Sequence, residues 1–247
     1  MKQKLTDEQL KIVRNTIKNN DEISLDDDYF EGISLSLSVE RGPNRYFFSH
    51  INLDFEEAIP DERLRYYQVH FDLVYNDDIL ARIAFMDIRM VSLYADEEER
   101  AMAIDESGDS DSTIGYFFKM DEIQLSPKHF QYMMEVFPSA GVNIAELHTF
   151  YISPEFRGLR IADFLYSHLN DLLYAEYNQV IYLLGVYINP FKEQCSLEQI
   201  DFGVTHYDEN VDEDGELFRV MYRALERNGF KSFGKGNRHF YKNMFDD

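Results

Sequence analysis

The stretch NIAELHTFYISPEFRGLRIADFLYSHLNDLLYAEYNQVIYLLGVYI, residues 143–188, decides the fold of this chain. Its first part, ending at Ile152, is apolar and β-branched and predicts a strand. From Ile161 onward apolar residues recur at helical spacing, and from Val180 a continuous apolar run is typical of a strand covered on both faces. Strand, helix and strand in this order predict a parallel crossover.

The turn between the first strand and the helix combines a glycine with two cations. Gly158 lets the backbone approach a ligand closely, and Arg157 and Arg160 can donate charge-assisted hydrogen bonds. The N-terminus of the following helix adds unpaired N–H groups and the positive end of the helix dipole. The turn therefore predicts a pyrophosphate site, although such turns also occur for structural reasons alone.

Periodicity predicts several further elements. From Tyr66, YYQVHFDLVY alternates its apolar residues, and Asn76–Asp78 turns the chain into ILARIAFMDIRMV, which predicts an antiparallel hairpin. A strand is expected at Ile33–Val39 and a helix after Ser126. The N-terminal residues predict an amphipathic helix capped by Thr6.

The C-terminal part predicts a second helix and a closing strand pair. The helix ELFRVMYRALERNGF ends at Gly229, and the strand pair is expected within KSFGKGNRHFYKNM. Two acidic segments, Ala95–Thr113 and Pro190–Gly215, are expected to be loops or insertions. The apolar face of the second helix is expected to consist of Leu217, Val220, Met221, Ala224 and Leu225.

Length and composition limit the class of protein. With 247 residues, 45% of them hydrophobic, the chain can bury one substantial core, so one main domain is expected. The N-terminus has no signal-peptide h-region, and the apolar run from Val180 is about half of the roughly 20 residues that a spanning helix needs. The single cysteine, Cys195, allows no internal disulfide, which favours a cytoplasmic protein.

The charge balance limits the partners. With 46 acidic and 24 basic residues the formal charge is −22, which repels nucleic-acid phosphate and anionic membranes and attracts cationic partners. We therefore expect neither direct nucleic-acid binding nor membrane binding, while a homodimer is left open. Residues 219–242 are basic by contrast, and they either bind an anion locally or balance nearby carboxylates.

The residues around the turn resemble the GNAT superfamily of acyl-CoA-dependent N-acyltransferases. The family motif [QR]-x-x-G-x-[GA] resembles Arg157–Ala162, with Arg160 where the motif has its central glycine, and the run-in resembles SPEFRG. The strand followed by Asn189, and the later helix ending in NGF, also resemble the family. The similarity covers roughly residues 66–244 and is clearest from Asn143.

The resemblance implies an α+β fold, with a mixed, mostly antiparallel sheet flanked by helices and a parallel strand-helix-strand crossover at the cofactor site. It implies a domain at residues 61–247 with insertions near 92–125 and 191–215, preceded by an N-terminal helix and acidic extension at residues 1–60. The implied cofactor is acetyl-CoA, held where the two parallel strands splay apart. The implied cofactor-binding residues are Phe150, Ile152, Arg157, Gly158, Leu159, Arg160, Ile161, Ala162 and Asn189.

The resemblance also implies the catalytic residues. The segment AEL…IS resembles that of the histone-acetylating members, which makes Glu146 the expected general base, and a buried carboxylate is a better proton acceptor than a solvated one. Many members use a tyrosine to protonate the leaving thiolate, but Leu225 stands at that position here. Tyr222, one turn earlier, is the nearest candidate acid.

Three functions remain open from the sequence. The leading one is an N-acetyltransferase that acts on a primary amine of a cationic acceptor, either a small polyamine-like molecule or a lysine-rich protein. The second is a catalytically degenerate GNAT-like acidic protein that binds a basic protein partner. The third is a calcium-binding or structural module, based on Asn210–Gly215, in which Met221 replaces the carboxylate that a calcium loop requires. No histidine or cysteine spacing predicts a metal site, and a dyad of Cys195 with His206 is disfavoured because no cations surround the cysteine.

Overall fold

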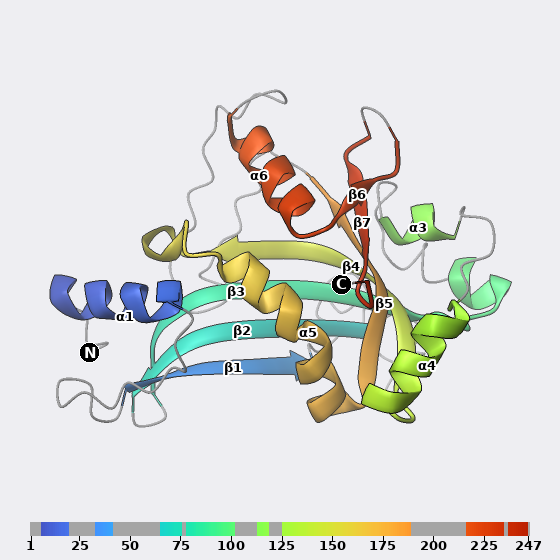
Figure 1. Ribbon diagram of the computed structural model, residues 1–247, viewed down its shortest axis with the longest axis horizontal. Coiled ribbons are helices and arrows are strands. Elements are labelled where there is room, and N and C mark those ends of the chain that lie inside the picture. The colour runs from blue at the N-terminus through green and yellow to red at the C-terminus, as the bar shows by residue number, and fades with distance from the viewer. Residues whose placement is uncertain are drawn as a thin grey trace, which may run out of the picture.

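A single seven-stranded sheet organises the protein (Figure 1). The computed structural model describes residues 6–19, 33–41, 65–75, 78–101, 113–118, 125–188, 216–234 and 237–246. The strands lie in the order β1-β2-β3-β4-β5-β7-β6, and only the β4–β5 pair is parallel. Their bounds are β1 Ile33–Arg41, β2 Arg65–Tyr75, β3 Asp78–Ser92, β4 Gly141–Ile152, β5 Gln179–Tyr187, β6 Lys231–Ser232 and β7 His239–Asn243. The expected mixed, mostly antiparallel α+β architecture is confirmed.

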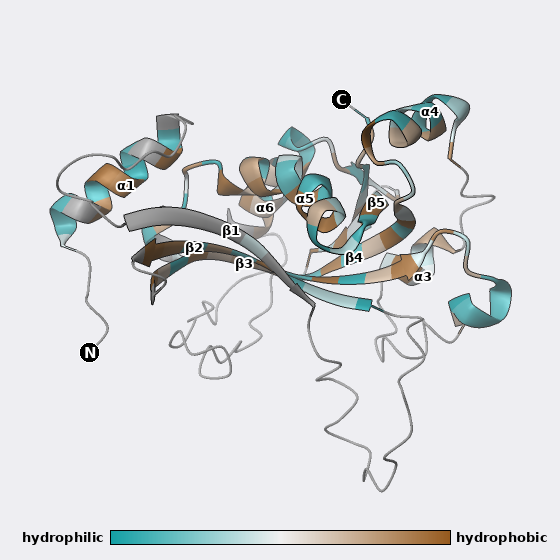
Figure 2. Cartoon of the chain, turned by 90° about the horizontal axis from the view of Figure 1, so that it is seen from below, coloured by the Kyte–Doolittle hydropathy of each residue, from teal (hydrophilic) through white to brown (hydrophobic). Residues whose placement is uncertain are grey.

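Helices cover both faces of the sheet (Figure 2). The helices are α1 Asp7–Asn19, α3 Thr113–Phe117, α4 Pro127–Val136, α5 Ile161–Tyr177 and α6 Glu216–Arg227, with a short 3-10 helix η1 at Pro154–Phe156. Side chains of α1, α5 and α6 pack into one core cluster on one face, and those of α3 and α4 pack into a second cluster. Figure 2 shows α1, α5 and α6 on one side of the sheet and α3 on the other.

The β2–β3 hairpin forms as the alternation predicts. Tyr67, Val69, Phe71 and Leu73 are all buried in the core under α1 and α5. The predicted strand at Ile33 is also present, and β1 pairs antiparallel with β2. Since β1 belongs to this sheet and Val13 of α1 belongs to the same core, residues on both sides of position 60 contribute to one structure.

Buried polar side chains fix the parallel β4–β5 pair at its beginning. Asn143 is completely buried, and its amide nitrogen donates to Val180 O at 3.0 Å and to Gln179 Oε1 at 2.9 Å. Arg65 of β2 donates to Asn143 Oδ1 at 2.8 Å and to Gln179 Oε1 at 2.7 Å. Farther along β5, Asn170 of α5 bonds both the N–H and the C=O of Ile181, which ties the crossover helix to its second strand.

Local capping explains where several helices begin and end. Ser126 caps α4 by accepting the N–H of His129 at 3.2 Å, and Gly229 ends α6 with a φ of +82°. The expectation of a loop from Ala95 was partly wrong, because residues 97–101 are helical and Thr113 begins α3. Asp96 and Glu99 supply the reason, since each side chain accepts the other residue's backbone N–H.

Of the predicted α6 face residues whose side chains are described, Val220 differs from the prediction. Val220 is 53% exposed, whereas Leu225 is buried in the core. Phe218 and Tyr222 pack against that core instead, two residues before and after Val220 and therefore on the opposite side of the helix from it. Helical spacing alone does not say which apolar residues of α6 face the core, because the helix carries more apolar residues than the core beneath it can cover.

Some predicted features lie outside the described residues. These are Asn189, the insertion at 191–215 with Cys195 and His206, and the calcium-like Asn210–Gly215. Among the helices of the described part of the chain, none is long and apolar enough to cross a membrane.

Candidate functional site

The parallel strands β4 and β5 stop pairing with each other near their carboxyl ends. Their ladder runs from the pair Gly141–Gln179 to the pair Leu147–Val186. Beyond it, β4 continues only along β3 as far as Ile152, and β5 continues along β7. The β3–β4 register shifts at His148, which stands in a bulge. Beyond Leu147, the backbone N–H and C=O groups on the β5 side of β4 therefore have no ladder partner in β5.

The turn that follows β4 leaves its glycine open to a ligand. Gly158 has a φ of +80°, and a Cβ built on it would meet no atom within 4 Å. The Arg157 side chain is exposed, and its Nε donates to Ile152 O at 3.1 Å. This bond holds the Arg157 stem against the end of β4, while the Gly158 backbone stays accessible.

Arg160, the residue before α5, occupies a conformation that favours glycine. Its φ and ψ are 61° and 27°, which is the left-handed region, and it is the N-cap residue of α5. Its side chain makes no cap hydrogen bond and instead donates from Nε to Asp163 Oδ2 at 2.9 Å. The first N–H groups of α5 are thus not used by the cap side chain, which is the arrangement that binds anions.

The Asp163 carboxylate lies in the first turn of α5, where it would repel a phosphate. Arg160 and Arg227 both form ion pairs with it, and Asn228 donates to its Oδ1 at 2.9 Å. Partial burial acts to raise the pKa of Asp163, but the hydrogen bonds from Asn228 and Arg227 and the charges of Arg227 and Arg160 lower it overall. The negative charge of Asp163 is therefore compensated locally. Arg227 belongs to the basic segment at residues 219–242. Its side chain therefore pairs with a carboxylate of the same protein.

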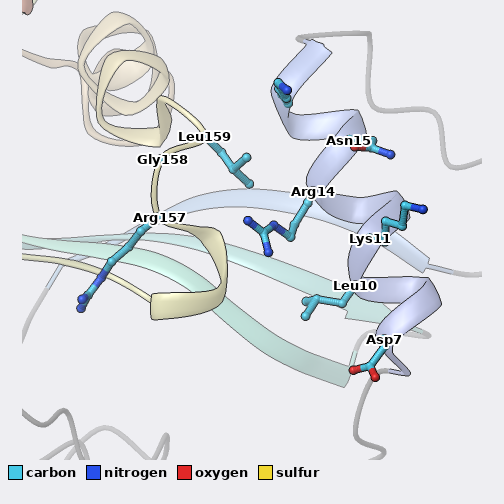
Figure 3. A pocket seen from close by; sticks show the side chains of 9 residues that line it. Asp7, Leu10, Lys11, Arg14, Asn15, Arg157, Gly158 and Leu159 are labelled. Atoms are coloured by element: carbon cyan, nitrogen blue, oxygen red, sulfur yellow. The ribbon is translucent and has the colours of Figure 1, made fainter.

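A pocket of about 560 Å³ lies between this turn and α1 (Figure 3). Arg14 extends from α1 toward the turn, and Leu10 and Leu159 extend from α1 and the turn, respectively, into the space between the two elements (Figure 3). The pocket is lined by Asp7, Leu10, Lys11, Arg14, Asn15, Lys18, Arg157, Gly158 and Leu159. Four of these nine residues are cations and one is an acid, in a chain with a formal charge of −22. Sequence reasoning connected the pyrophosphate with the turn but not with α1, which is about 140 residues away in the chain.

The other predicted cofactor-binding residues divide into two groups. Ile161 is buried in the core, so its side chain anchors α5. Phe150, Ile152, Leu159 and Ala162 are half-buried on the face that carries α1 and α5, and the Phe150 ring packs edge-on against Tyr166 at 5.8 Å. The structure thus places these four along one path from the end of β4 to the start of α5.

The predicted base, Glu146, lies beneath α3 on the opposite face. It is 5% exposed, and its Oε1 accepts the backbone N–H of Thr113 at 2.9 Å. In the sheet it stands opposite Arg89 of β3 and Gly185 of β5. Gly185 has to lack a side chain, because a Cβ there would overlap the Thr113 side chain. The close approach of α3 to the sheet therefore depends on this glycine.

A histidine without a sequence motif completes the polar cluster around Glu146. Thr113 Oγ1 lies 3.0 Å from His239 Nδ1, and His239 is buried. The imidazole is stacked on Tyr116 at 4.0 Å and lies 4.6 Å from the ring of Tyr187. We define the Glu146 cluster as Glu146, Thr113 and His239. No spacing along the chain could reveal it, since the three residues come from β4, α3 and β7.

The predicted acid, Tyr222, belongs to the other face. Its ring packs edge-on against Phe240 at 5.3 Å, within the core under α5 and α6. A hydrogen bond to the Glu226 carboxylate, together with its charge, raises the pKa of Tyr222 and keeps the phenol protonated. Phe240 pairs with Val186 at the end of the β4–β5 ladder, so Tyr222 and the Glu146 cluster flank the strand separation from opposite faces. Leu225 is buried and carries no acid.

No group of three metal-ligating side chains occurs within the described ranges. Comparisons of the chain with protein-family models, with curated proteins and with solved structures give no match.

Proposed function

We propose that the protein is an N-acetyltransferase of GNAT type that moves an acetyl group from acetyl-CoA to a primary amine of a cationic acceptor. The observation that carries the proposal is the end of the β4–β5 ladder at Leu147–Val186, followed along the chain by a turn with an open Gly158 and an uncapped α5. Parted parallel strands offer free backbone groups to an amide-containing chain such as pantetheine. An open helix N-terminus suits a pyrophosphate.

The residues of the turn fit this cofactor chemically. The Gly158 backbone and the first N–H groups of α5 would hold the pyrophosphate, and the charge of Asp163 is offset by Arg160 and Arg227. Phe150 and Ile152 would contact the pantetheine arm. The Arg160 guanidinium donates a hydrogen bond to the Asp163 carboxylate. The backbone of Arg160, rather than its guanidinium, would therefore face the phosphate.

The two candidate catalytic residues could serve as a general base and a general acid. Acetyl-CoA supplies an activated thioester, from which acyl transfer forms an amide bond and frees a thiol. Glu146 would take the proton that the amine nitrogen loses, directly or through water. Tyr222 would supply a proton to the departing sulfur as a neutral phenol. The acidic surface attracts a cationic acceptor.

A second candidate function is a GNAT-like acidic protein without turnover that binds a basic protein. Two observations favour it: Glu146 is covered by α3, and Leu225 is buried where family members often carry an acid. This candidate predicts binding of a lysine-rich protein whether or not acetyl-CoA is present.

Thermal unfolding with and without millimolar acetyl-CoA tests the proposal. A ligand that binds only the native state at about 100 times its Kd adds about 2.7 kcal/mol, which is about 5–10 °C in Tm for a domain of this size. Gly158→Asp places a carboxylate at the phosphate position and should abolish this shift. Release of the CoA thiol with an amine acceptor would then establish turnover. The absence of any shift in the wild type would overturn the proposal in favour of the acidic binding protein.

A further inference from the structure

Helix α1 presents a row of cations beside its buried face. Leu10, Val13 and Ile17 contact the core, and Lys11, Arg14 and Lys18 follow one another at spacings of three and four residues. Such spacings place the three cations on one stripe of the helix. All three are exposed. Of the three, Arg14 points across the pocket toward Gly158 and Leu159 (Figure 3).

The Arg14 guanidinium has no carboxylate partner among the described residues, in a chain with 46 acidic residues. Arg157, by contrast, directs its guanidinium away from the pocket (Figure 3) and bonds Ile152 O. The positive charge at the center of the pocket therefore comes from α1, while the turn contributes backbone. Asp7 lines the pocket as well, and Figure 3 shows it at one end of α1.

We propose that α1 binds the 3′-phosphate of coenzyme A, with Arg14 as the principal contact and Lys11 and Lys18 flanking it. This inference rests on the proposed function, because it takes the pyrophosphate to lie at Gly158 and the N-terminus of α5. The nucleotide end of CoA carries one further phosphate on its ribose, and the pocket between that turn and α1, about 560 Å³, has room for it. The N-terminal helix is thereby a specificity element for 3′-phosphorylated nucleotides.

The test compares CoA with 3′-dephospho-CoA by isothermal titration calorimetry. The Arg14→Glu variant loses a charge-assisted contact to the phosphate and places a negative charge there instead. Its affinity for CoA should therefore be about 10- to 100-fold weaker than that of the wild type. Binding of 3′-dephospho-CoA should change by less than about 3-fold, because that ligand lacks the group in question. Arg14→Lys keeps the charge and should recover most of the affinity for CoA.

Arg223→Glu is the matched control, because Arg223 is an exposed cation on α6 that does not line the pocket, and the change in net charge is the same. It should leave both affinities within about 2-fold. Unchanged CoA binding by Arg14→Glu, or an equal loss for the two ligands, would overturn the role of α1 and leave the proposed function intact. Failure of the wild type to bind either ligand would instead overturn the proposed function, and this inference with it. Since Arg14 is exposed, unfolding midpoints of the variants should match the wild type, which separates lost binding from lost folding.

Discussion

The backbone N–H of Thr113 donates a hydrogen bond of 2.9 Å to the carboxylate of Glu146, 33 residues farther along the chain. This bond joins the first residue of α3 to the middle of β4. The same threonine approaches His239 with its hydroxyl. One residue of a short helix therefore contacts both ionisable members of the Glu146 cluster. Substitution of Glu146 tests the chemistry of the cluster, and substitution of Thr113 tests its contribution to stability.

Glu146→Gln should preserve the fold and acetyl-CoA binding but reduce kcat by about 10²- to 10⁴-fold, the usual contribution of a general base. The amide oxygen of glutamine can still accept the Thr113 N–H, so the free energy of unfolding should change by less than about 1 kcal/mol. Steady-state kinetics with an amine acceptor and urea unfolding measure the two effects. An unaltered kcat would remove Glu146 from the mechanism.

Thr113→Val should destabilise the protein by about 1–3 kcal/mol, because the His239 imidazole loses its hydroxyl partner in a buried site. Valine keeps the shape of the side chain beside Gly185 and the backbone N–H that reaches Glu146. Chemical denaturation gives the magnitude. Thr113→Ser, which keeps the hydroxyl and loses the methyl group, is the control for packing. Unchanged stability of Thr113→Val would show that the hydrogen bond to His239 contributes nothing.

Arg160→Gly should be more stable than Arg160→Ala by about 1 kcal/mol, because only the glycine relieves the left-handed conformation. Both variants lose the exposed ion pair with Asp163, so that loss cancels in the comparison. Gly158→Ala should show the opposite sign, with a loss of about 1 kcal/mol at a φ of +80°. Unfolding free energies of the three variants check this, and equal stability of the two Arg160 variants would contradict the assigned conformation.

Asp163 should make part of the stability depend on pH. Its folded pKa lies below the unfolded value of about 3.9, so its contribution is present above about pH 4 and is lost as the pH falls through the folded pKa. We expect Asp163→Asn to cost about 0.5–1 kcal/mol at pH 7, the range for partly exposed pairs, and progressively less toward pH 3.

Urea unfolding of the wild type and Asp163→Asn across that pH range measures the difference. Arg227→Gln removes one of the partners of Asp163 and should show a weaker form of the same trend. A difference between wild type and Asp163→Asn that stays constant from pH 7 to pH 3 would mean that the carboxylate charge contributes nothing.

Much of the fold could be predicted because its signals are local. The alternation from Tyr67 to Leu73, the apolar run of β5 and the helical spacing of α5 each identify an element within one stretch of chain. Element order then indicated the parallel β4–β5 pair, which the register confirms. The prediction for Val220 was wrong, because helical spacing does not say which edge of an apolar stripe the partner covers.

The sequence by itself determined most of the secondary structure and the turn at Gly158, since periodicity and glycine chemistry act over a few residues. Only the tertiary structure decided what surrounds these elements: that α1 brings Arg14 to the turn, that Glu146 lies under Thr113, and that His239 joins them. These contacts depend on strand register and helix placement, which are set by packing the whole core and leave no short-range pattern in the chain.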